Sequence, residues 1–143
     1  MPTSKSSNLA AETEALREVY AAINRNDIPG ALKFFDPQIE RVELEGFPSA
    51  GIYRGHAEVM AHLSQGRDTW AEGTCEPERF IAAGDKIVVF LYVRVRLKDN
   101  TEWLEGRLAD VFTFRNGKAI QMRTFDDRRQ ALEWAGVNAS DAN

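Results

Sequence analysis

The sequence predicts one α+β domain, in which helices from the first half of the chain cover one face of a curved antiparallel sheet from the second half. Apolar residues recur at helical spacing as far as residue 35, and apolar alternation dominates after residue 75. The alternating segments are joined by GD, DN and RNG turns, which are typical of hairpins. A chain of 143 residues with 43% hydrophobic content can bury one such core and is too short to expect two.

The first half is predicted to hold three helices and one strand. Residues 1–8 are polar and Ser-rich, which predicts a flexible tail, and residues 9–25 carry apolar side chains at helical spacing. Asp27, followed by Ile-Pro, predicts the cap and opening turn of a short second helix that the DP dipeptide ends. Three further elements are expected: a strand at 39–46, a loop at 47–55 and a helix at 56–63.

The second half is predicted to be a meander of long strands closed by a helix. The closing helix is expected from about Asp127 to Ala135, with Gly136 as its stop. The single domain therefore spans residues 9–136, and residues 137–143 form a C-terminal tail. The strands are expected at 75–83, 86–98, 102–114 and 118–125.

Alternation along these strands assigns one side of each to the interior. In KIVVFLYVRVRLK every odd-numbered position is aliphatic, so that side is predicted to face the helices. In the next strand Asp110 shares its side with Leu108 and Phe112, and in the last strand Thr124 shares its side with Met122. Asp110 and Thr124 are therefore polar members of otherwise apolar walls.

Composition and charge argue against several classes of protein. The formal net charge of -4 comes from interspersed signs without a basic stripe, so no nucleic acid partner is expected. The start of the chain has no apolar run of signal-peptide length, and IVVFLYV is too short to cross a bilayer, so a cytoplasmic protein without membrane contact is expected. Cys75 is the one cysteine, and His56 and His62, six residues apart, are expected on a helix surface. Neither a metal nor a cofactor is expected.

The segments VYAAINRNDIPGALKFF, YRGHAEVMAHL and ADVFTFRNGKAIQMRTFDD occur in an order and at a spacing that resemble the nuclear transport factor 2-like superfamily, particularly its SnoaL-like polyketide cyclase and steroid Δ-isomerase branches. The resemblance implies a cystatin-like, cone-shaped half-barrel of curved sheet wrapped around N-terminal helices, with an apolar pocket open at one end. It also implies a homodimer through the outer sheet face. Aromatic and arginine side chains typical of an interface lie on that face: Phe90, Tyr92, Arg94, Trp103, Arg107 and Phe125.

The resemblance also implies site residues. The isomerase pattern of an acid, a spacer and Phe-x-Phe matches DVFTF, which places at Asp110 the carboxylic acid that helps to hold a dienolate oxygen. Ungapped counting from the shared N-x-x-D helix end places the isomerase general base at Glu43. The tyrosine that donates to the same oxygen falls on Val19, with Tyr20 about 100° further round the helix. The aspartate of the epoxide hydrolase relatives falls on Thr124, which disfavours hydrolase chemistry.

The residues themselves leave two roles open for Asp110. A buried carboxyl group without partners stays neutral, and a neutral acid in an apolar cavity can donate to a carbonyl oxygen that gains charge. Alternatively, Asp110 pairs with an arginine or a helix-end amide and only fixes the strand register. Strand alternation places Glu43 with Arg41 and Glu45, which favours a solvated face for Glu43.

Three functions are compatible with these patterns. The leading hypothesis is a cofactor-independent enzyme of the isomerase or cyclase kind that moves a proton on a small hydrophobic carbonyl compound, with Asp110 at the oxygen and Glu43 as base. The alternatives are a non-catalytic module that binds a small hydrophobic molecule, and a dimerising domain whose cone is filled by its own side chains. The residues expected to contact a ligand are Val19, Tyr20, Tyr53, Met60, Leu63, Leu108, Phe112, Met122 and Thr124.

Overall fold

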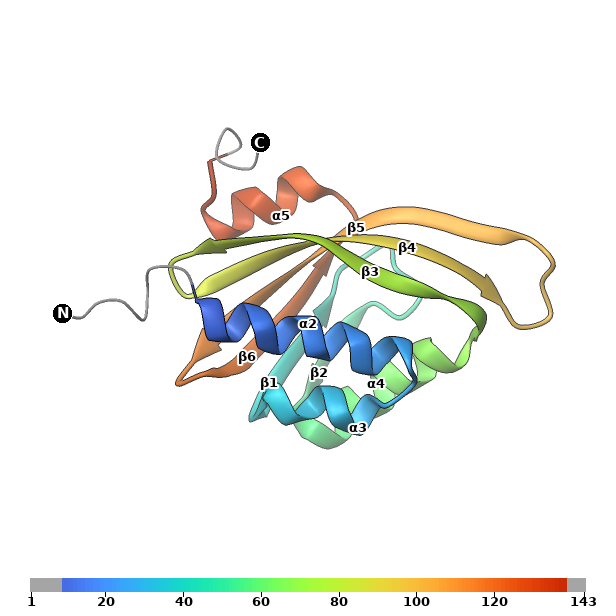
Figure 1. Ribbon diagram of the computed structural model, residues 1–143, viewed down its shortest axis with the longest axis horizontal. Coiled ribbons are helices and arrows are strands. Elements are labelled where there is room, and N and C mark those ends of the chain that lie inside the picture. The colour runs from blue at the N-terminus through green and yellow to red at the C-terminus, as the bar shows by residue number, and fades with distance from the viewer. Residues whose placement is uncertain (1–8, 139–143) are drawn as a thin grey trace.

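The structure, a computed structural model, describes residues 9–138 and has the predicted α+β architecture (Figure 1). The tails expected at 1–8 and in 139–143 lie outside the described residues. The helices are α2 (Ala10–Asn24), α3 (Ile28–Ala31), the 3-10 helix η1 (Leu32–Phe34), α4 (Gly55–Asp68) and α5 (Arg128–Ala135). The strands are β1 (Phe35–Glu43), β2 (Gly51–Arg54), β3 (Trp70–Ala83), β4 (Lys86–Leu97), β5 (Trp103–Arg115) and β6 (Lys118–Phe125).

The strands form one six-stranded sheet in the order β2-β1-β6-β5-β4-β3. The sheet is curved and unclosed, and α2 lies along its concave face (Figure 1). Neighbouring strands are antiparallel except β1 and β6, which are parallel. This pair corrects the expectation of a purely antiparallel sheet: the chain leaves β1 through β2 and α4, and β6 pairs with the other edge of β1 only after the β3–β6 meander.

The concave face carries the larger core. On α2 the buried side chains include Leu16 and Val19, spaced by three residues as a helix stripe requires. They belong to one cluster with the inward residues Ile87 and Val89 of β4 and with Phe112 of β5. The odd-numbered face of β4 is therefore the inner one, as its alternation predicts.

Helices cover both faces of the sheet at one end, which differs from the prediction that one face is covered. Helix α5 lies on the side opposite α2 (Figure 1). Its Ala131 and Leu132 form a second buried cluster with Val88, Val111 and Phe125 of the sheet. Phe125 is buried in this cluster and the neighbouring Phe90 is partly buried against it, so α5 covers part of the face expected to form the dimer.

Several element boundaries differ from those predicted. Strand β1 begins four residues early and passes through Pro37, which it tolerates because the pairing register with β6 shifts between Phe35 and Glu40. Strand β2 occupies part of the predicted loop, α4 runs five residues further, and β3 begins at Trp70. The early starts of β1 and β3 depend on pairing of Phe35 with Ala119 and of Trp70 with Leu97, and local spacing does not contain these partners.

The caps and turns follow the sequence signals. The Asp27 side chain accepts the backbone N–H of Gly30 at 3.0 Å and caps α3. Asp127 caps α5 in the same way, and Gly136 ends that helix with a φ of 80°. Within residues 9–138, no helix has the length and apolar content needed to span a membrane.

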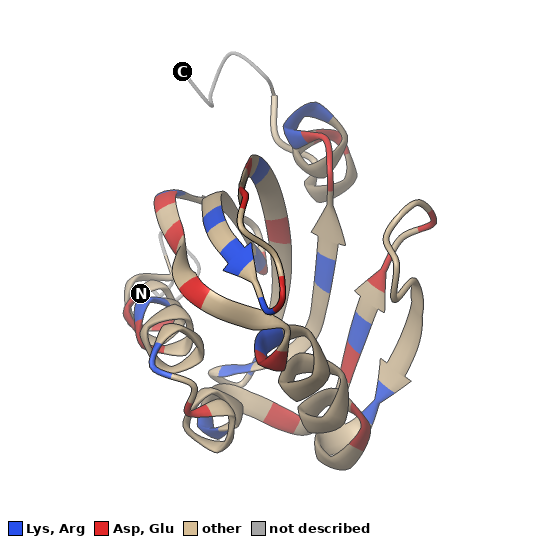
Figure 2. Cartoon of the chain, turned by 90° about the vertical axis from the view of Figure 1, so that its right-hand side faces the viewer, with Lys and Arg blue, Asp and Glu red and all other residues tan. Residues whose placement is uncertain are grey.

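Charged side chains of both signs are interspersed along the strands and helices (Figure 2). On the outer side of β3, β4 and β5 they form cross-strand pairs, such as Arg94 with Glu105 at 3.3 Å and Arg96 with Glu72 at 2.7 Å. These pairs are largely exposed, so each adds little to stability.

Candidate functional site

A cavity of about 300 Å³ lies between α2, α4 and the concave face of the sheet. Its walls are mainly apolar and include Ile23 from α2, Leu63 from α4 and Leu91 from β4. The loop between β1 and β2 adds Phe47. Among the polar side chains that line the cavity are Tyr20, Arg41, Glu43, His62, Asp110 and Thr124.

Asp110 lies on the concave face of β5, with Val89 of β4 and Thr124 of β6 as its register partners. It is 3% exposed, and both carboxyl oxygens accept hydrogen bonds at 2.5 Å, Oδ2 from the Tyr20 hydroxyl and Oδ1 from the Thr124 hydroxyl. Burial raises the pKa of Asp110, and it outweighs the Arg41 charge and the two hydrogen bonds, which lower that pKa. The environment therefore shifts Asp110 towards its neutral form, which carries a proton it can donate.

Tyr20 reaches Asp110 because α2 crosses the concave face. Its side chain is 2% exposed, and its ring packs edge-on against Phe112 with centroids 6.2 Å apart. Burial and the nearby Asp110 hold the pKa of Tyr20 well above its ordinary value. The tyrosine therefore keeps its hydroxyl proton at neutral pH.

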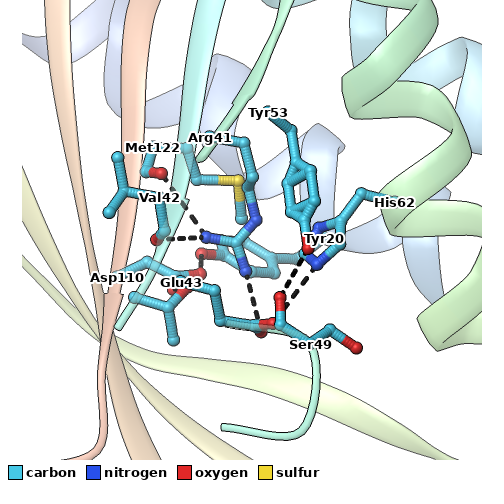
Figure 3. Close-up of polar contacts among 10 residues, drawn as sticks. Tyr20, Arg41, Val42, Glu43, Ser49, Tyr53, His62, Asp110 and Met122 are labelled. Atoms are coloured by element: carbon cyan, nitrogen blue, oxygen red, sulfur yellow. Dashed lines mark hydrogen bonds and ion pairs between the residues drawn. The ribbon is translucent and has the colours of Figure 1, made fainter. Parts of the chain in front are cut away.

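Glu43 lies between Arg41 and His62 (Figure 3). Its Oε2 is 3.3 Å from Arg41 Nη2, and its Oε1 is 3.2 Å from His62 Nε2. Arg41 is 5% exposed, and its Nη1 also donates to the carbonyl oxygens of Val42 and Met122. Burial acts to raise the pKa of Glu43, but the hydrogen bond from His62 and the Arg41 charge together hold that pKa below its ordinary value. Glu43 is therefore ionised at neutral pH.

The sheet register places the two carboxyl groups in one cross-strand row. Glu43 of β1 is the partner of Thr124 of β6, and Thr124 is the partner of Asp110 of β5. Two strand spacings separate the Cα atoms of the two acids, which is about 10 Å. The neighbouring row places Arg41 beside Met122. The cavity thus holds an ionised carboxylate and a carboxyl group that favours its neutral form, at opposite ends of one row.

The structure brings together most of the residues predicted from the sequence. The two predicted catalytic acids, Asp110 and Glu43, line the same cavity. Five of the nine residues expected to contact a ligand also line it, namely Tyr20, Leu63, Leu108, Met122 and Thr124.

The other four do not line the cavity. Val19 and Phe112 are fully buried in the core beside it. Met60 is 40% exposed, because it lies about 100° round α4 from the buried Val59. Tyr53 stacks on a cavity residue, His62, but is not itself part of the lining. The ungapped count therefore missed the tyrosine position by one residue: Tyr20, not Val19, reaches Asp110.

Two expectations from the pattern were wrong. Glu43 and Arg41 face the cavity and not solvent, because α5 and its cluster cover the other side of the sheet near Leu44. His62 is 9% exposed and not on the helix surface. Arg41 and His62 were not predicted as site residues. Strand alternation places Arg41 and Glu43 on the same face of β1, so assigning Glu43 to the interior would also have assigned Arg41 to it.

Cys75 and the acids do not form a metal centre. Among the described residues, no group of three or more His, Cys, Asp and Glu side chains is arranged to hold a metal ion. Cys75 lines the cavity, but burial, with a smaller contribution from Asp110, raises the pKa of its thiol. The thiol is therefore protonated and a poor nucleophile.

A curved sheet around a long helix, with a cavity that is apolar along its walls and polar along one row, defines a member of the nuclear transport factor 2-like superfamily. The chain matches the family model of the SnoaL-like domain over residues 16–122. It belongs to the SnoaL-like domain family.

Solved structures agree with this assignment. A nuclear transport factor 2-like protein of unknown function from Burkholderia pseudomallei is 26% identical, with a TM-score of 0.74 over 87% of this chain and 97% of that chain. TerC, co-crystallised with polyporic acid, is 28% identical, with a TM-score of 0.73 over 87% and 97% of the two chains. A similar protein from Burkholderia xenovorans is 28% identical, with a TM-score of 0.70 over 91% and 98%. No curated protein sequence matches the chain significantly.

Proposed function

We propose that this protein binds a small hydrophobic carbonyl compound and moves a proton on it without a cofactor, as an isomerase or cyclase does. One observation carries the proposal: two carboxyl groups share one row of one cavity, and their environments displace their pKa values in opposite directions. Such separation gives one fold an acid and a base at the same pH. The apolar walls hold a hydrophobic substrate and exclude water.

In the proposed step the Glu43 carboxylate removes a proton from the carbon next to the carbonyl group. The C–H electron pair moves into the new C=C bond, and the carbonyl π electrons move to the oxygen. Neutral Asp110 donates a hydrogen bond to that oxygen, while Tyr20 and Thr124 fix the orientation of the Asp110 carboxyl group. An isomerase returns the proton from Glu43 to another carbon. In a cyclase the enolate carbon attacks a second carbonyl carbon of the same molecule, the π electrons of that carbonyl group move to its oxygen, and this oxygen takes the proton from Glu43.

The similarity to TerC supports a small organic ligand. That protein has been co-crystallised with polyporic acid, and this chain is 28% identical to it over nearly its full length. A ligand with an acidic or conjugated oxygen suits a cavity whose polar row contains both a buried acid and the Arg41 guanidinium.

A second candidate, binding without catalysis, is favoured by one specific contact pattern. Both Asp110 oxygens already accept hydrogen bonds from Tyr20 and Thr124. A carboxyl group with satisfied partners can serve as a fixed handle for a ligand without taking part in proton transfer.

We also propose a homodimer through the part of the outer sheet face that α5 leaves uncovered. Trp103 is 38% exposed there, and the Arg94 guanidinium lies 4.1 Å from the centre of its ring. Arg107 lies over the ring of Tyr92 in the same way, at 4.7 Å. Stacked arginine and aromatic side chains of this kind are common at the centres of protein interfaces.

Carbon-bound hydrogen exchange separates the two candidates. Wild-type protein is incubated in D₂O with a β,γ-unsaturated ketone that fits the cavity, and NMR follows deuterium uptake and double-bond migration. We expect Glu43→Gln to lower the exchange rate by about 10²- to 10⁴-fold, whereas Glu45→Gln, an exposed control just beyond β1, retains it. Retention of a bound ketone by the wild type without any exchange, across a panel of such ketones, would favour the binding module.

A further inference from the structure

The Glu43 carboxylate is held from outside its own strand by a buried histidine of α4. His62 is 9% exposed, lines the cavity, and places Nε2 3.2 Å from Glu43 Oε1 (Figure 3). Its ring is stacked on the ring of Tyr53, with centroids 3.8 Å apart and planes 20° from parallel. The ring thus has one face fixed by an aromatic neighbour and one nitrogen directed at the proposed base.

We propose that His62 is a positioning residue for Glu43, which donates its Nε2–H to Oε1 and orients the carboxylate towards the substrate carbon. This inference rests on the proposed function, because it assigns His62 a part in the reaction that Glu43 would begin. His62 acts through Glu43 and does not itself take the substrate proton.

The hydrogen-bond pattern selects the tautomer of His62. Among the described residues, Nδ1 is buried and has no hydrogen-bond partner. Nε2 is the ring nitrogen that faces Glu43. An ionised carboxylate only accepts, so a neutral ring that binds it carries its proton on Nε2.

Two donors together fix the plane of the carboxylate. His62 binds Oε1 and Arg41 binds Oε2, one from α4 and one from β1. Each carboxylate oxygen has two lone pairs, so each retains one for the substrate proton. A glutamate held by one donor only can rotate about its last torsion, and a reacting group displaced by 1 Å can lose about 100-fold in rate.

Tyr53 extends this arrangement to the loop that borders the cavity. Its hydroxyl donates to the carbonyl oxygen of Ser49 at 2.6 Å, in the same loop as Phe47 of the cavity wall. The loop, the histidine ring and the carboxylate are therefore linked by consecutive contacts. His56, also on α4, differs from His62, because its Nε2 lies 2.9 Å from the carbonyl oxygen of Phe35 and it does not line the cavity.

Loss of His62 has a specific electrostatic consequence. The charged and titratable groups near Glu43 are Arg41 from its own strand, His62 from α4 and Asp110 across the sheet. The His62 hydrogen bond favours the ionised form of Glu43, whereas burial opposes it. Without that bond, Glu43 takes up its proton at a higher pH. Any activity that needs ionised Glu43 then falls sooner as the solution is acidified.

The test compares full-length wild type with His62→Leu, His62→Gln and the control His56→Gln. Protein labelled with ¹³C at glutamate carboxyl groups is titrated by NMR, and the Glu43 resonance is assigned with Glu43→Gln. His62→Leu should move the Glu43 midpoint to higher pH, and His62→Gln, which keeps a side-chain N–H, should move it less. His56→Gln should leave it unchanged. The acid limb of ketone exchange should move with the midpoint, with a rate loss of up to about 100-fold at mildly acidic pH.

The inference and the proposed function fail separately. An unchanged Glu43 midpoint in folded His62→Leu would overturn the positioning role, whatever the exchange activity. A shifted midpoint in a protein whose wild type exchanges no ketone hydrogen would support the contact and overturn the proposed function. If His62→Leu does not fold, the ¹⁵N spectrum of the wild-type imidazole decides: a ring protonated on Nδ1 and bare on Nε2 contradicts the proposal.

Discussion

Replacing Tyr20 with phenylalanine removes one hydroxyl group from the centre of the site. That hydroxyl donates to Asp110 Oδ2 at 2.5 Å, and the two side chains are 2% and 3% exposed. Little of either group is exposed, so solvent is a poor replacement for the lost donor, while the edge-on packing of the ring against Phe112 is kept. Leaving a buried acceptor without its partner costs about 1–3 kcal/mol. For a domain of this size, the loss lowers Tm by roughly 3–10 °C.

Thermal and urea unfolding followed by circular dichroism measure this loss. Tyr53→Phe is the matched control, because its hydroxyl donates to an exposed carbonyl group, and its unfolding free energy should change by less than about 1 kcal/mol. The double variant Tyr20→Phe with Asp110→Leu should cost less than the sum of the two single changes, since both partners of the bond are then absent. Equal stability of Tyr20→Phe and the wild type, or strict additivity in the cycle, would refute a direct bond between Tyr20 and Asp110.

Two further predictions concern pH and assembly. Because burial raises the folded-state pKa of Asp110, its contribution to stability is present below about pH 4, the range of its unfolded pKa, and is lost as pH rises through the folded value; urea unfolding of Asp110→Asn should lack this decrease. A decrease of the same size in Asp110→Asn would assign it to another group. Trp103→Glu should convert a dimer to a monomer in sedimentation velocity, and circular dichroism should show that the monomer keeps its fold. An unchanged sedimentation coefficient would exclude this face as the interface.

The position of Asp110 is predictable from the sequence for a simple reason. Strand pleating sends alternate side chains to opposite faces, so the apolar neighbours Leu108 and Phe112 determine the side on which Asp110 lies. The same reasoning identifies Thr124, and the register then makes the two residues direct partners. Local periodicity was sufficient here because both strands present apolar residues around the polar one.

Periodicity was insufficient for the other end of the row. Alternation separates Arg41 and Glu43 from Val42, but it does not say which face is covered by other elements. Helix α5, about 90 residues further along the chain, covers the side near Leu44, and α4 covers the side of Glu43. The polar face of β1 is therefore internal, which no pattern within residues 39–46 indicates.

His62 illustrates a limit of helical spacing. Val59, His62 and Leu63 lie within one helical stripe, but so do Val59, Met60 and Leu63 if the helix is rotated. The rotation of α4 is set by its packing on β1, and that packing places His62 inside and Met60 outside. A sequence pattern with few large apolar residues on α4 leaves this choice open.

The placement of Arg41 suits a reaction in which negative charge moves across the cavity. The Arg41 charge lowers the pKa of both Glu43 and Asp110, so the guanidinium acts on both ends of the row. Before the proposed proton transfer the negative charge is on Glu43, and afterwards it is on the substrate oxygen at the Asp110 end. Arg41 compensates the charge in both states, so the reaction relocates a charge without creating one in an apolar cavity. The electrostatic work is therefore small, because the charge stays within reach of the same fixed cation.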